Sequence, residues 1–272
     1  MLRFVNGSLA PWIISVGRIG YLAKGLIFIC VGLLSAAAAL RGGARATDSR
    51  GVMQAIVQQP FGHALLLALI LGLVCYIVWR TLAAIADAGG KGSDVKGLAL
   101  RARSLVVAGI YSGITAAAVR TLMGATRTGG GGDQSARDWT ARVLATPFGS
   151  WTVMLIGAAV LGGGAYQCYR AYKEKFEEKL DLSELTAEGR DWIVRVCGFG
   201  LTARGIVFAI AGTLLIQAGL QSNPAKARGL GGALNSLHAH LFGRWLFALV
   251  AAGLAAYGVY CCVKARYGKI GE

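Results

Sequence analysis

Carboxylate side chains are scarce in this chain and absent from its apolar segments. The 272 residues include 13 Asp and Glu against 28 Lys and Arg, which gives a net charge of +15. No Asp or Glu lies inside any of the six segments that are apolar enough to cross a bilayer. Proton- and cation-coupled transporters usually hold an intramembrane carboxylate that takes the proton or coordinates the ion. The sequence therefore disfavours that kind of transport.

Metal-binding and catalytic patterns are also missing. His63 stands alone, and the His238-x-His240 pair has no third ligand of a suitable type nearby in the sequence. The six cysteines form no Cys-x-x-Cys pair, and small buried side chains are their expected role. No Gly-x-Ser-x-Gly, His-Glu-x-x-His or paired acidic motif is present. We therefore expect no metal, no cofactor and no enzymatic activity.

Apolar sequence, in contrast, is abundant. Hydrophobic residues make up 55% of the chain, and the mean hydropathy is +0.56. Crossing about 30 Å of hydrocarbon takes about 20 helical residues. Two of the apolar windows have 16 residues and become long enough if Lys24 and Arg103 extend their charged ends to the interface. Windows without any charged residue are 25–40, 61–79, 104–119, 143–169, 205–225 and 245–263. The prediction is an all-α membrane protein, a single membrane domain with six transmembrane helices.

The basic residues lie mainly in the linkers between these segments, so we expect no nucleic-acid partner. One set of linkers comprises the N-terminus, residues 80–103 and 170–195, and the C-terminus, with 15 Lys and Arg. The other set comprises residues 41–61, 120–142 and 221–244, with 10. Basic residues concentrate on the cytoplasmic side of membrane proteins. The count therefore predicts that both termini are cytoplasmic.

A unit of two apolar helices occurs three times, over residues 12–90, 98–175 and 193–267. In each unit a Phe-Gly pair starts the second helix, and a Tyr followed three residues later by another aromatic residue ends it. The pairs are Phe61-Gly62, Phe148-Gly149 and Phe242-Gly243, and the endings are Tyr76/Trp79, Tyr166/Tyr169 and Tyr257/Tyr260. Because each unit crosses twice, the repeats are parallel, which predicts pseudo-threefold symmetry about the membrane normal.

Small residues and aromatic residues mark two further roles in these helices. Small residues let transmembrane helices approach closely, and the glycines predicted to pack helices together are Gly20, Gly25, Gly32, Gly109, Gly113, Gly200, Gly205 and Gly212. Aromatic and basic residues near helix ends favour the membrane interface, and the predicted interfacial anchors are Tyr76, Trp79, Arg80, Tyr166, Tyr169, Arg170, Tyr257 and Tyr260. Repeats one and three align at a constant offset, whereas in repeat two Gly109 takes the central glycine position and Ala108 replaces the basic residue before it.

The linkers contain shorter amphipathic stretches. Residues 48–57, 135–144 and, more weakly, 229–237 are predicted to form interfacial helices on the outer surface. The charged connector 173–195 is predicted to extend the fourth apolar helix into the cytoplasm, after which Ser183 would cap an amphipathic helix. This connector is either a solvated link or a surface that docks a partner.

Three segments of the first repeat carry a family resemblance. They are RIGYLAKGLIF at 18–28, QPFG at 59–62 and GLVCYIVWR at 72–80. Together they resemble the bacterial family called domain of unknown function 1206, whose members contain three tandem two-helix units. The resemblance implies this topology and a place in the bacterial inner membrane. It implies no activity and transfers no catalytic or binding residue.

Lys24 and Arg204 are the best candidates for a functional site. They hold equivalent positions in the first helices of repeats one and three, inside the apolar boundary, with no acidic partner in their own helices. If they face the bundle axis, they are candidate contacts for an anionic solute or a lipid headgroup. The alternative is that both side chains extend to the interface, as long basic side chains readily do.

Two functions compete on this basis. The first is a structural or interaction module that associates with membrane lipids, with a membrane-protein partner or with a second copy of itself. The second is a carrier of small solutes or anions along the pseudo-threefold axis, with Lys24 and Arg204 at its cytoplasmic mouth. A polar cavity containing both basic groups would favour the carrier, and a filled axis with both groups turned outward would contradict it.

Overall fold

The computed structural model describes residues 11–40, 49–85, 94–124, 132–173, 177–183, 185–228, 232–233 and 243–268. Its six long helices are α1 (Pro11–Leu40), α3 (Gly62–Ile85), α4 (Val95–Leu122), α6 (Gly149–Tyr172), α7 (Ala187–Leu220) and α9 (Gly243–Tyr267). Each contains a segment long and apolar enough to cross a membrane. The chain is therefore an all-α, multi-pass membrane protein, as predicted.

Two short helices correspond to the predicted amphipathic stretches. They are α2 (Ser49–Val57) and α5 (Gly132–Leu144). α2 does not lie apart from the protein, because Val52 and Met53 are fully buried against the long helices. Most of the third stretch, 229–237, and Asp48 lie outside the described residues. The position of these helices at a membrane surface stays a prediction.

Both short helices lead into the same turn. Phe61 and Phe148 have left-handed backbones, with φ of 61° and 62°. The turn is closed by Gly62 N–H donating to Gln59 O at 2.8 Å, and by Gly149 N–H donating to Thr146 O at 2.9 Å. Since the two Phe-Gly turns match bond for bond, they align the second helices of repeats one and two at an offset of 87 residues.

The long helices pack in a cyclic order. The second helix of each repeat packs along the first helix of the next, which pairs α3 with α4, α6 with α7, and α9 with α1. α1 also packs on α3, and α7 on α9, within their own repeats. Among the described residues, α4 and α6 of repeat two form no such packed pair. The second repeat is therefore open between its two helices.

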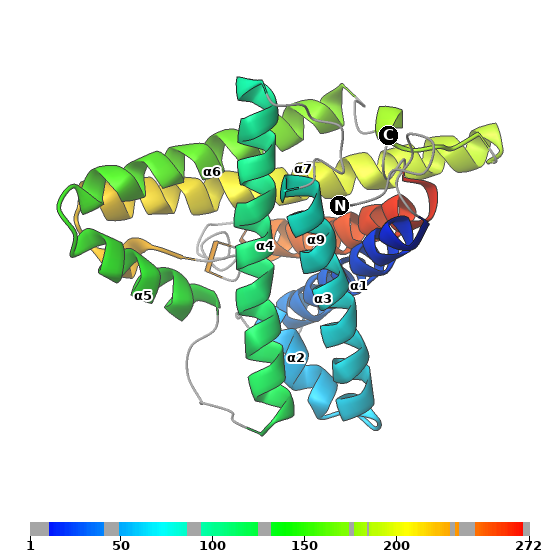
Figure 1. Ribbon diagram of the computed structural model, residues 1–272, viewed down its shortest axis with the longest axis horizontal. Helices are drawn as coiled ribbons and strands as arrows, with labels where there is room; N and C mark the ends of the chain where they lie inside the picture. The colour runs from blue at the N-terminus through cyan, green and yellow to red at the C-terminus, as the bar shows by residue number, and fades with distance from the viewer. Residues whose placement is uncertain are drawn as a thin grey trace.

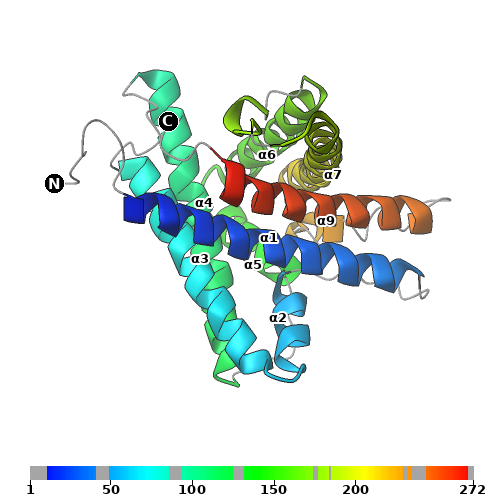
Figure 2. The same ribbon diagram turned by 90° about the vertical axis from the view of Figure 1, so that its right-hand side faces the viewer.

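The three pairs run in different directions. α4 is vertical in Figure 1, whereas α6 and α7 lie horizontally side by side. α1 and α9 lie side by side across Figure 2, with α3 descending steeply from them. The expected alignment of six helices around one axis is therefore replaced by three crossing pairs, and the cyclic order of packing is the part of the symmetry that the structure retains.

Glycines bring the paired helices close together. A Cβ atom at Gly25 would lie 2.7 Å from Cys262 Sγ and 2.8 Å from Gly258 O, on α9. At Gly205 it would lie 2.5 Å from Cys168 Sγ and 2.8 Å from Gly164 O, on α6. Six of the eight predicted packing glycines meet a neighbouring helix in this way: Gly20, Gly25, Gly32, Gly200, Gly205 and Gly212. Their matched surroundings show that α1·α9 and α6·α7 are equivalent interfaces.

The other two glycines do not pack inside this chain. No atom lies within 4 Å of a Cβ built on Gly109 or Gly113, and both are exposed on α4. The buried positions of α4 are instead Ala108, Tyr111 and Thr115. The predicted packing role of the two glycines is therefore wrong within this chain.

The alignment of repeat two is consequently shifted by one residue. The Tyr111 ring packs edge-on against Tyr76 at 4.7 Å, as the Phe28 ring does against Tyr257 at 4.9 Å. Tyr111 is thus the counterpart of Phe28, at an offset of 83 residues. With this offset Val107, and not Ala108, takes the place of Lys24.

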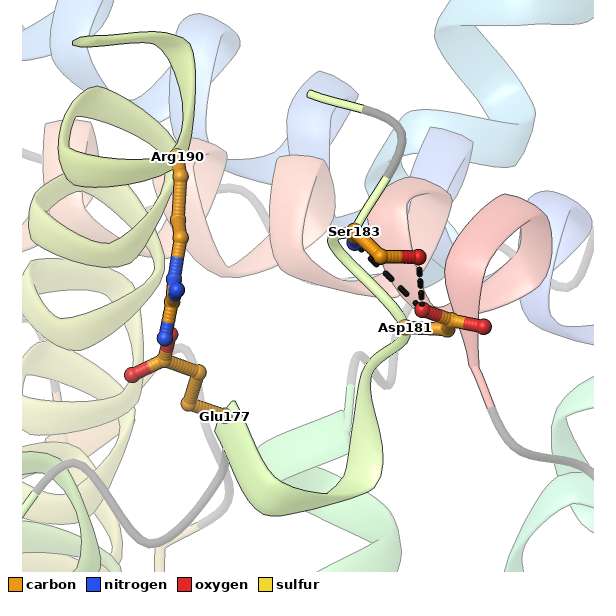
Figure 3. A network of polar contacts seen from close by, with 4 residues as sticks. All are labelled: Glu177, Asp181, Ser183 and Arg190. Carbon is orange, nitrogen blue, oxygen red and sulfur yellow. Dashed lines mark hydrogen bonds and ion pairs between the residues drawn. The ribbon is translucent and has the colours of Figure 1, made fainter. Parts of the chain in front are cut away.

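The charged connector folds back onto α9 and does not continue α6 as a long helix. α6 ends at Tyr172, and the 3₁₀ turn η1 (Glu177–Lys179) follows. Asp181 N–H then donates to Tyr267 O at 2.7 Å. Ser183 caps no helix, because its hydroxyl donates to the Asp181 carboxylate at 2.6 Å (Figure 3). The predicted helical extension and its Ser183 cap are therefore wrong.

α7 begins earlier than predicted. Thr186 is its N-cap, accepting a hydrogen bond from Gly189 N–H at 3.3 Å. Near this start, Arg190 forms an ion pair of 2.5 Å with Glu177 of the connector (Figure 3). α7 has 34 residues, about 51 Å of helix, so its acidic first turns extend beyond the length needed to cross.

Candidate functional site

Lys24 points into the protein. Its side chain is 4% exposed, and the ammonium donates a hydrogen bond of 3.2 Å to the Tyr76 hydroxyl. The ammonium also lies 5.1, 5.6 and 5.4 Å from the ring centroids of Tyr76, Tyr111 and Tyr257. These rings come from α3, α4 and α9. Lys24 therefore does not extend to the membrane interface.

Arg80 approaches the same hydroxyl from the other side. Its Nε and Nη2 atoms donate to Tyr76 Oη at 3.0 and 2.9 Å. Since both side chains bond one oxygen, their nitrogens lie within roughly 6 Å of each other. At an effective dielectric of about 20, two like charges at that separation repel by about 3 kcal/mol. A third cation, Lys264, lies 4.8 Å from the ring of Tyr21, which Arg80 also faces at 6.0 Å.

Arg204 has a comparable environment in repeat three. Its Nη1 donates to Gln167 Oε1 at 2.7 Å, and its guanidinium lies over the rings of Phe208 at 4.4 Å and Tyr257 at 4.5 Å. The Nε atom is buried and has no hydrogen-bond partner. An unsatisfied buried N–H costs about 1–3 kcal/mol, and more when the group is charged.

The ring of Tyr257 joins the two predicted site residues. Lys24 lies 5.4 Å and Arg204 4.5 Å from its centroid, so their charged groups are roughly 10 Å apart or less. Every one of the six long helices contributes a side chain to this region. We call it the basic-aromatic cluster, and it consists of Lys24, Tyr76, Arg80, Tyr111, Gln167, Arg204 and Tyr257.

Positive charge in the cluster is not balanced by carboxylates. The sequences of α1, α3, α4, α6 and α9 contain no Asp or Glu. Glu188 and Asp191 of α7 precede Arg204 by at least 13 residues, about 20 Å along the helix. Each cation–π contact contributes about 0.5–2 kcal/mol, whereas burying an ion costs several kcal/mol. The rings thus offset part of this cost, and the arrangement suits an oxyanion that accepts hydrogen bonds from Lys24, Arg80 and Arg204.

Four predicted interfacial anchors are buried and do not face headgroups. Tyr76, Trp79, Tyr257 and Tyr260 lie in the protein core, which corrects the prediction for these residues. The cause is the pair of glycines opposite them, because Gly20 and Gly200 leave room for the backbones of Tyr76 and Tyr257. The rings then turn inward, where they meet cations from neighbouring helices.

The remaining predicted anchors differ from these four. Tyr166 and Tyr169 are exposed on α6, and Arg170 is half-buried, so an interfacial role stays a prediction for them. At the offset of 87 residues, Gly163 is the counterpart of Tyr76, and Tyr166 is the counterpart of Trp79. Repeat two therefore lacks the inward tyrosine of the other two repeats.

Part of the cluster was not predicted from the sequence. Arg80 was interpreted as an anchor, and Tyr111 and Gln167 were given no role in a binding site. The Tyr76-x-x-x-Arg80 spacing was an available signal, since residues four apart share one face of a helix. A glutamine in an otherwise apolar segment, as at Gln167, is a second such signal.

This fold and cluster define a multi-pass α-helical membrane protein built from three repeats, with unbalanced positive charge at the place where its helices meet. The chain belongs to the DUF1206 family, "Domain of Unknown Function (DUF1206)", which matches it three times, over residues 19–87, 103–174 and 199–268. The family resemblance in the sequence is thereby confirmed. The curated "Uncharacterized protein YxxB" of Bacillus subtilis (strain 168) is 34% identical over 257 residues, covering 94% of this chain and 92% of that protein. No solved structure matches the chain.

Proposed function

We propose that this protein is a lipid-associated structural module of the bacterial inner membrane that binds an oxyanion at the basic-aromatic cluster. The observation that carries the proposal is that Lys24 and Arg80 share one hydroxyl acceptor in a buried region without carboxylates. An anion placed among Lys24, Arg80 and Arg204 removes their mutual repulsion and satisfies the free Arg204 Nε. The module has no enzymatic role in this proposal.

The depth of the cluster supports binding at the level of lipid headgroups. Arg80 and Gln167 each lie 18 residues after the glycine that starts their helix, which is about 27 Å of helix. The hydrocarbon core is about 30 Å thick. The cluster therefore lies close to one membrane surface, the one with more basic linker residues, which we propose is cytoplasmic.

Anion transport is the second candidate. It is supported by the inward orientation of both Lys24 and Arg204. However, the rings of Tyr76, Tyr111 and Tyr257 pack around Lys24, and the two described pockets, of about 540 and 430 Å³, lie on the charged connector around Glu177 and Arg190. The packed rings favour a binding site over a path.

Thermal unfolding of the purified protein in a neutral detergent tests anion binding. Sodium phosphate is compared with sodium chloride at equal ionic strength, for the wild type and for the double variant Lys24→Met/Arg204→Met. A ligand at one hundred times its Kd stabilises by about 2.7 kcal/mol. We expect phosphate to stabilise the wild type and not the double variant.

Arg195→Gln is the matched control, because Arg195 is an exposed base on the same helix as Arg204. This variant should respond to phosphate as the wild type does. An equal phosphate response in the double variant, or none in the wild type, contradicts the proposed function.

A further inference from the structure

The opening in repeat two has a cause in the sequence. In repeats one and three the two helices touch where Gly20 meets the backbone of Tyr76, and where Gly200 meets that of Tyr257. At the offset of 83 residues, the counterpart of these glycines in repeat two is Arg103. A long charged side chain thus stands where the other repeats need a glycine, and α4 and α6 do not pack together.

A second arginine lies on the other side of this opening. Arg170 of α6 has a buried Nη2 atom without a hydrogen-bond partner. The charges of Arg170, Arg80 and Arg204 all act on Arg103. Arg103 and Arg170, on the two helices that border the opening, are therefore electrostatically continuous with the basic-aromatic cluster.

The surface of α4 beside Arg103 is apolar. Val106 is the counterpart of Ala23, which packs against Gly72 of the partner helix in repeat one. In repeat two Val106 has no such cover, and both Val106 and Ile110, one turn further on, are exposed. The opening thus has cationic groups at one level and uncovered aliphatic side chains directly beside them.

We propose that an anionic phospholipid occupies the opening between α4 and α6. Its phosphate is held by Arg103, Arg170 and the Arg204 side of the cluster, and its acyl chains lie against Val106 and Ile110. This inference rests on the proposed oxyanion binding and adds the source of the anion and its direction of access, from within the membrane plane. A soluble anion has no use for the aliphatic wall, whereas a lipid needs both parts.

Native mass spectrometry of protein released from nanodiscs containing equal amounts of phosphatidylglycerol and phosphatidylcholine tests the inference. The wild type should retain phosphatidylglycerol in preference to phosphatidylcholine. Arg103→Gln/Arg170→Gln should lower this preference about tenfold or more, as expected from the loss of charge-assisted hydrogen bonds. Arg120→Gln is the control, because Arg120 is an exposed base at the far end of α4, and it should behave as the wild type.

Arg103→Gly adds an independent variant. It restores the glycine of the other repeats and should also lower phosphatidylglycerol retention, since α4 and α6 can then close together. Retention of phosphatidylglycerol by both Arg103 variants at the wild-type level overturns the inference. If inorganic phosphate stabilises the wild type while no phosphatidylglycerol is retained, the oxyanion site stands and lipid access is overturned. If neither phosphate nor phosphatidylglycerol binds, both proposals fail.

Discussion

Lys24 and Arg80, on different helices of the first repeat, donate hydrogen bonds to the same oxygen atom, the hydroxyl of Tyr76. Two cations are thereby held within roughly 6 Å in a region without carboxylates. Stability alone does not account for such a pair, because replacing buried charges by well-packed apolar residues is often neutral or stabilising. The pair is better explained as one half of a site whose other half is an anion.

The shared acceptor gives the first prediction. Tyr76→Phe removes the oxygen and leaves two cations without it, so unfolding in phosphate-free buffer should become easier by about 1–3 kcal/mol. Tyr166→Phe is the control, because Tyr166 is exposed. Thermal unfolding followed by size-exclusion chromatography measures both. Equal losses in the two variants would show that the Tyr76 hydroxyl has no special role.

The second prediction contrasts two glycines. Gly25→Ala places a methyl group within 3 Å of α9 and should destabilise the protein by about 1–3 kcal/mol. Gly109→Ala meets no atom within 4 Å and should stabilise α4 by up to about 1 kcal/mol, since alanine favours helices over glycine. The sign of each change is read from the unfolding temperature. Stabilisation by Gly25→Ala would contradict the α1·α9 interface.

The Phe-Gly turns give the third prediction. Phe148 is 80% exposed and has a left-handed backbone, a conformation that costs a non-glycine residue about 1–2 kcal/mol. Phe148→Gly should therefore be more stable in detergent than Phe148→Ala by about 1 kcal/mol. Phe61, 86% exposed with the same φ, should show the same order. Equal stability of the glycine and alanine variants would contradict a strained turn.

The fourth prediction concerns topology. The distribution of basic linker residues predicts that a reporter fused after Glu272 is cytoplasmic. Paired fusions to a fluorescent protein that matures in the cytoplasm and to a phosphatase active only in the periplasm measure this. Phosphatase activity without fluorescence would reverse the orientation and place the cluster near the periplasmic surface.

The sequence was sufficient for the helices, the repeats and the two basic residues Lys24 and Arg204. These features depend on local composition and on spacing along one chain. An apolar segment of sufficient length becomes a helix in lipid because its backbone groups must be satisfied internally. The equivalence of Lys24 and Arg204 likewise follows from a constant offset between two well-matched repeats.

The direction of the tyrosines was beyond reach of the sequence alone. A tyrosine near a helix end suits a membrane interface as well as a cation site, and the choice depends on which residue of another helix lies opposite. Gly20 and Gly200 make that choice for Tyr76 and Tyr257. The one-residue shift of repeat two was missed for a similar reason, since the sequence of α4 offers both Ala108 and Gly109 as the central small residue and packing selects Ala108.

The stability of Lys24→Met in phosphate-free buffer tests the central claim most directly. If the cluster exists to bind an anion, removing one buried cation should leave the protein at least as stable as the wild type, and up to about 1–4 kcal/mol more stable, while the response to phosphate is lost. If instead the cation–π contacts of Lys24 serve only to hold the helices together, Lys24→Met will be less stable and any response to phosphate will persist. The second result would contradict the account.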